Sequence, residues 1–74
     1  MRDPNRLYPF YQQLTEIHMR SFPDIRFGQL MCNFLGWMQV NKRLDPFFPE
    51  EDKMLEYLKE YANEYSAIYK KWEK

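Results

Sequence analysis

An unbroken helical repeat fills the last third of the chain and constrains the fold more than any other feature. Apolar residues recur there at alternating spacings of four and three, with no proline or glycine between them: Met54, Leu58, Tyr61, Tyr65, Ile68 and Trp72. This spacing is typical of a coiled-coil-like helix seam. Pro49 opens the segment, and acidic residues fill its first turn, where they complement the helix dipole. We therefore predict a long C-terminal helix over about residues 49–73.

Two shorter helices are expected before it. Asp3 and Pro4 form an N-cap and a first-position proline, and an apolar stripe that includes Tyr11 and His18 follows. After a tight connection, Asp24 is placed to cap a second helix. These patterns predict helices over about residues 4–20 and 25–40. Because 74 residues form one small domain, we expect an all-α fold, a small three-helix bundle that occupies residues 1–74.

Small residues recur on the expected second helix. Gly28, Cys32 and Gly36 follow one another four residues apart. Glycine costs up to about 1 kcal/mol in a helix interior, so this stripe indicates that another helix crosses there at close range. The alternative is that the helix merely tolerates both glycines. In either case we interpret Cys32 as a packing residue.

The residues needed for common catalytic and cofactor sites are missing from the sequence. One cysteine and one histidine cannot form an internal disulfide or a four-ligand zinc site, and two glycines cannot build a phosphate-binding loop. Neither serine lies in a nucleophile motif. His18 is the one candidate for catalysis, but its position beside an apolar stripe favours a structural role. We therefore expect a protein that is not an enzyme and holds no cofactor or metal.

The charge balance argues against strong, non-specific binding to nucleic acid. Eleven basic residues offset eleven acidic ones, which leaves no net charge. A narrower alternative is a small helix-turn-helix-like DNA-binding regulator, because Arg26, Gln29 and Asn33 share one polar helix face and are types that contact base edges. No export signal or membrane span is apparent, and a lone thiol fits the reducing cytoplasm. We expect a cytoplasmic location.

Aromatic residues indicate where a protein partner would bind. The C-terminal helix would span roughly 37 Å against roughly 25 Å for each of the others, so its last turns overhang. These turns carry an aromatic stripe that the first helix, a second copy in a dimer, or another protein would cover: Tyr61, Tyr65, Tyr69 and Trp72. Phe47 and Phe48 form a second aromatic group between two prolines. They either dock onto a partner or, as the core's small size favours, place at least one ring in the bottom of the bundle.

Three segments resemble a group of small uncharacterised proteins of Gram-positive bacteria and their phages. These segments are RDPNR at residues 2–6, PDIRFGQL at residues 23–30 with Asn33, and DPFF at residues 45–48 followed by Glu51 and Asp52. The resemblance covers residues 2 to about 60 and carries no assigned reaction. It implies a small helical protein that binds and blocks a host protein. Together with the aromatic groups, it leads us to expect a protein–protein interaction module, an inhibitor or adaptor of a bacterial enzyme or defence complex.

Overall fold

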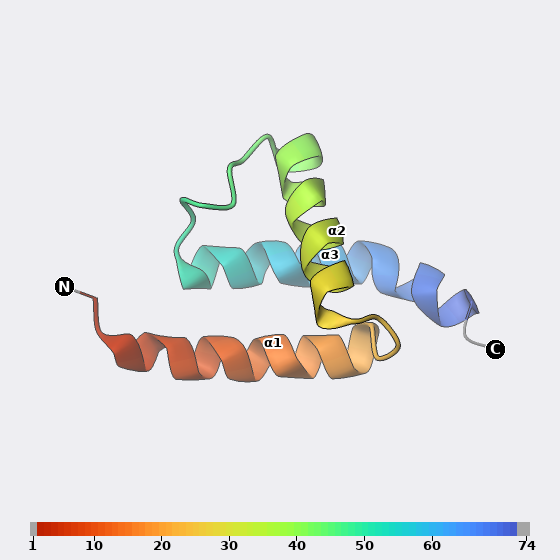
Figure 1. Ribbon diagram of the computed structural model, residues 1–74, viewed down its shortest axis with the longest axis horizontal. Coiled ribbons are helices and arrows are strands. Elements are labelled where there is room, and N and C mark those ends of the chain that lie inside the picture. The colour runs from red at the N-terminus through yellow and green to blue at the C-terminus, as the bar shows by residue number, and fades with distance from the viewer. Residues whose placement is uncertain (1, 73–74) are drawn as a thin grey trace.

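The structure, a computed structural model, describes the backbone of residues 2–72 and the side chains of residues 2–66. Its described residues form three α-helices and no strand, which confirms the all-α class. The elements are a 3-10 turn η1 (Pro4–Arg6), α1 (Leu7–Ser21), α2 (Phe27–Trp37), a π-helical turn η2 (Met38–Lys42) and α3 (Glu51–Trp72). Helices α1 and α3 lie side by side and run in the same direction, and α2 crosses over α3 (Figure 1).

The helical chain begins at Pro4, as the cap signal predicts, but its first turn is a 3-10 turn. Asp3 Oδ1 accepts a hydrogen bond from the Asn5 amide (2.9 Å), and Pro4 occupies the first helical position. Pro9 is the third residue of α1. A proline is tolerated in this first turn because backbone N–H groups there have no partner inside the helix.

The second helix starts two residues later than expected. The Ile25 amide donates to the Phe22 carbonyl (3.2 Å), which keeps the chain in a turn after α1. Arg26 is the N-cap residue, with extended backbone and no side-chain cap hydrogen bond. The expectation that Asp24 caps this helix is therefore wrong.

The end of α2 also differs from the prediction. After Trp37 the helix widens into the π-turn, and Arg43 ends it with φ 55°, in the left-handed region. The apolar spacing predicts a simple helix to about residue 40. The wider turn places Met38 fully inside the core, so tertiary burial accompanies the irregular ending.

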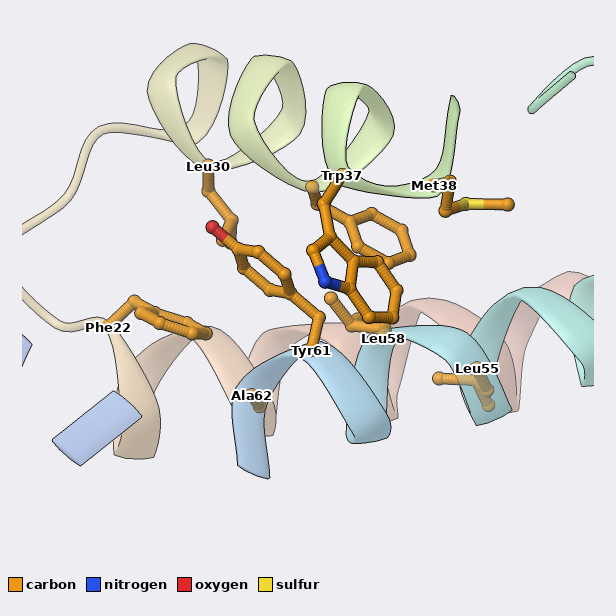
Figure 2. Close-up of a cluster of buried hydrophobic side chains, with 9 residues drawn as sticks. Phe22, Leu30, Trp37, Met38, Leu55, Leu58, Tyr61 and Ala62 are labelled. Atoms are coloured by element: carbon orange, nitrogen blue, oxygen red, sulfur yellow. The ribbon is translucent and has the colours of Figure 1, made fainter. Parts of the chain in front are cut away.

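One apolar core joins α2 and α3 and is closed by the segment after α1 (Figure 2). Tyr61 of α3 lies at its centre, with the rings of Phe22, Phe34 and Trp37 at centroid distances of 5.5–5.6 Å. Helix α1 covers one side with half-buried side chains. The buried set is Phe22, Leu30, Phe34, Trp37, Met38, Leu55, Leu58, Tyr61 and Ala62, and α1 adds Phe10, Leu14 and Ile17.

The stripe of small residues on α2 does not mark a close helix crossing. A Cβ atom added to Gly28 or Gly36 would meet no atom within 4 Å outside its own helix backbone. Cys32, between them, is exposed. The predicted close crossing and the predicted packing role of Cys32 are both wrong, because this face of α2 points away from the core.

Candidate interaction site

The loop between η2 and α3 holds two aromatic rings in a turn fixed by its own backbone. Asp45 accepts two hydrogen bonds: its Oδ1 atom from the Phe47 amide (3.0 Å) and its carbonyl oxygen from the Phe48 amide (3.2 Å). Pro46 and Pro49 flank the pair and restrict φ on both sides. We call Phe47 and Phe48 the aromatic turn. Local hydrogen bonds and prolines thus predefine the positions of these two rings.

Both rings of the aromatic turn face outward. Phe47 is 82% exposed and Phe48 is 73% exposed. The rings contact each other edge to face, with centroids 5.0 Å apart and an interplanar angle of 83°. The alternative that one of them fills the bottom of the bundle is therefore wrong. Leu44 and Met54 are the residues near this loop that pack against the core.

Ion pairs are present on both sides of the loop. Before it, Lys42 pairs with Glu60 of α3 (2.6 Å), and the hydrogen bond to this carboxylate raises the pKa of Lys42 above its ordinary value. After it, Glu50 pairs with Arg2 near the N-terminus. One ion pair thus joins the loop to α3 and the other joins it to the N-terminal segment, both through partly exposed side chains.

A shallow groove of about 340 Å³ adjoins Phe48. Leu44, Pro49 and Tyr57 give it apolar walls, and three charged side chains stand at its edge: Arg43, Asp45 and Lys53. An exposed aromatic pair beside a groove with mixed charges can hold an apolar side chain of a partner and orient its polar neighbours. This arrangement has the chemistry of a recognition surface.

The other predicted partner-binding residues are not gathered at this site. Tyr61 is only 3% exposed, so the structure assigns it to the core and not to a docking surface; α2 crosses α3 at that point and covers it. Tyr65 is half-buried against Tyr61, with ring centroids 4.9 Å apart. The side chains of Tyr69 and Trp72 lie outside the described residues.

The residues of the DNA-binding alternative are all exposed. Arg26, Gln29 and Asn33 lie at the start of α2 and along its first turns. Arg26 is the single cation among residues 21–41 of the sequence, so phosphate contacts on this face would depend on it. That these three residues contact DNA bases stays a prediction.

His18 has a clear structural contact. Its Nε2 atom lies 2.6 Å from the Ile25 carbonyl oxygen, and an Nε2–H there donates across the connection between α1 and α2. The described residues contain no group of three or more metal-ligating side chains. Among the same residues, no helix combines the length and apolar character that crossing a bilayer requires.

A second apolar surface was not predicted from the sequence. Tyr8, Tyr11 and Met19 of α1 are 78%, 57% and 68% exposed, and Phe27 at the start of α2 is 61% exposed. The spacing predicts Tyr11 in the core stripe, but its side chain is exposed, and its ring lies edge to face against that of the half-buried Phe10 (centroids 5.1 Å apart). The signal was present: Tyr8, Tyr11, Thr15 and Met19 follow one another at spacings of three and four.

No protein-family model, curated protein or solved structure matches this chain.

Proposed function

We propose that this protein is a protein–protein interaction module that uses the aromatic turn as its main contact. The observation that carries the proposal is the exposure of Phe47 and Phe48 on a turn that Asp45 holds in place. Aromatic side chains dominate the energetics of many protein interfaces, and a preformed turn loses little entropy when it binds. Exposed apolar patches on soluble proteins often mark interaction sites, and two adjacent phenylalanines on an ordered turn form such a patch.

The proposed partner is a host protein in the bacterial cytoplasm. The resemblance to small proteins of Gram-positive bacteria and phages supports the role of an inhibitor or adaptor of an enzyme or defence complex, encoded by a bacterium or its phage. The groove edge carries cations from Arg43 and Lys53 and an anion from Asp45. A partner surface with an apolar pocket rimmed by mixed charges would complement it.

The test is affinity capture from a Gram-positive cell lysate, followed by mass spectrometry. Wild-type protein is compared with the double variant F47A/F48A and with V40A, a matched control that truncates another exposed apolar residue, 76% exposed. We expect a partner recovered with the wild type and V40A and lost with F47A/F48A. Hot-spot residues cost about 2 kcal/mol or more each, so the affinity should fall at least roughly 100-fold. Recovery of the same partners with all three proteins would contradict the proposal.

The C-terminal part of α3 is proposed as an auxiliary contact. Its apolar stripe would continue beyond Tyr65 through Tyr69 and Trp72, on a helix that would extend past its neighbours. Y69A/W72A should keep the fold, as measured by far-ultraviolet circular dichroism. It should weaken binding of the captured partner less than F47A/F48A does. A loss of cooperative unfolding in Y69A/W72A would instead assign these residues to the core.

A further inference from the structure

The outer face of α1 exposes several apolar side chains, set among polar ones, that the proposed function does not use. One groove, of about 690 Å³, runs along Tyr8 and Tyr11. A second, of about 480 Å³, continues past Met19 to Phe27. Tyr11 and Thr15 line both grooves, so the two form one surface. We call this surface the α1 face. In the view of Figure 1, α1 forms one border of the molecule and α3 packs on its other side.

We propose that the α1 face binds a second copy of this chain, with the two α1 helices packed antiparallel about a two-fold axis. This inference is independent of the proposed function, because it involves different residues and leaves the aromatic turn free.

The exposed area is sufficient for a dimer. Aromatic side chains can each bury about 150–250 Å², so the exposed fractions of Tyr8, Tyr11, Met19 and Phe27 amount to roughly 500 Å² per copy. Two copies would then remove roughly 1,000 Å² from water by these residues alone, which is the lower bound for a specific interface. Pro4, Leu7, Gln12 and Thr15 of the same grooves add to this area.

The pattern of side-chain sizes is self-complementary in the antiparallel arrangement. With the axis at the level of Gln13, Tyr11 faces Thr15 of the second copy, so a large ring meets a small side chain. In the same register, Leu7 of one copy faces the flexible Met19 of the other, and Tyr8 faces His18. An isologous contact of this kind closes on itself and gives a dimer without further growth.

The charge pattern favours the same occupant. Between Arg6 and Arg20, Glu16 is the single charged residue of α1. The centres of protein interfaces are depleted of charged residues. Because this face has a single acidic group, it offers little charge complementarity to a strongly charged partner. In the antiparallel dimer, the two Glu16 side chains lie on opposite sides of the axis, so they do not face each other.

The test measures the oligomeric state of the full chain by sedimentation equilibrium up to about 1 mM, a range that covers weak dimers. We expect a monomer–dimer equilibrium in the wild type. Y11E places a carboxylate at the centre of the contact, and we expect dimer affinity to fall roughly 100-fold or more. V40E adds the same charge to an exposed residue of η2 and should leave the dimer unchanged.

Folding is checked separately by circular dichroism, and T15E is a second variant in case Y11E does not fold. A wild type that is monomeric throughout the range would overturn the proposal. So would a dimer that Y11E and T15E leave intact, because the contact would then lie elsewhere. A dimer that dissociates only in F47A/F48A would assign the second copy to the aromatic turn. An assembly of more than two copies would exclude the closed two-fold contact.

Discussion

Trp37 buries its indole ring in the core, yet its Nε1–H group has no hydrogen-bond acceptor among the described residues. Its environment explains how this is tolerated. The indole lies against the ring of Tyr61 at a centroid distance of 5.5 Å and an interplanar angle of 63°, and Figure 2 shows the nitrogen on the edge that faces Tyr61. An N–H group directed at an aromatic face makes a weak hydrogen bond with the π-system. We therefore predict that the ring of Tyr61 compensates this buried donor.

This pairing predicts an energetic coupling between the two residues. A double-mutant cycle with W37F and Y61L should give about 0.5–1.5 kcal/mol of interaction energy in the free energy of unfolding, measured by urea denaturation. A control cycle with W37F and L14A, whose Leu14 is on α1, should be additive within about 0.5 kcal/mol. If the first cycle is as additive as the control, the N–H group of Trp37 is not compensated by Tyr61.

At the scale of single elements, α2 contains two glycines without a packing reason. Both lie in the helix with negative φ and open space at the Cβ position. Alanine restricts the unfolded chain and favours the helix, so G28A and G36A should each raise the free energy of unfolding by about 0.5–1 kcal/mol. The melting temperature should then rise by roughly 2–8 °C per substitution.

The control for this prediction is C32A, a change on the same exposed face that replaces no glycine. It should alter the melting temperature less than either glycine substitution. A fall in stability in G28A or G36A would mean that another helix does approach this face closely, as the stripe of small residues first indicated.

The existence of the three helices could be predicted from spacing and caps because both are local properties of the chain. The end of α2 could not, because the π-turn accompanies the burial of Met38, which depends on where α3 lies. The same reason explains why Tyr11 is exposed although its spacing places it in the core stripe. Helix α1 carries apolar residues on two adjacent edges, and only the position of α3 decides that the edge with Phe10 enters the core.

The candidate site was predictable in part. The prolines beside Phe47 and Phe48 mark a loop from sequence alone. Whether the rings enter the core depends on which other side chains fill that end, and Leu44, one residue before Asp45, packs there. The prediction that at least one of these two rings must be buried, which rests on the small size of the core, is therefore wrong.

At the scale of the whole molecule, the two candidate surfaces belong to different elements. The α1 face borders the molecule, whereas the aromatic turn belongs to the loop that leads into α3 (Figure 1). The starts of α1 and α3 are held together by ion pairs, Arg2 with Glu50 and Arg6 with Glu51. These two ion pairs, which we call the clamp, join the start of the helical chain to the end of the loop that carries the aromatic turn.

The clamp makes stability depend on pH in the acid range. A hydrogen bond from the Arg6 guanidinium (2.9 Å) holds the pKa of Glu51 below its ordinary value. The unfolded chain therefore binds a proton at Glu51 more readily than the folded one. The contribution of the pair is complete above about pH 4.3, the ordinary pKa of glutamate, and is lost as the pH falls through the lower pKa of the folded state.

Urea unfolding midpoints from pH 7 to about pH 3 should show this loss as a steeper decline in the wild type than in E51Q, which has no carboxylate to protonate. E56Q is the matched control, because Glu56 pairs with Lys53 inside α3 and does not contact α1. It should keep the wild-type slope. Equal slopes in the wild type and E51Q would mean that Arg6 and Glu51 do not hold the two helices together in solution.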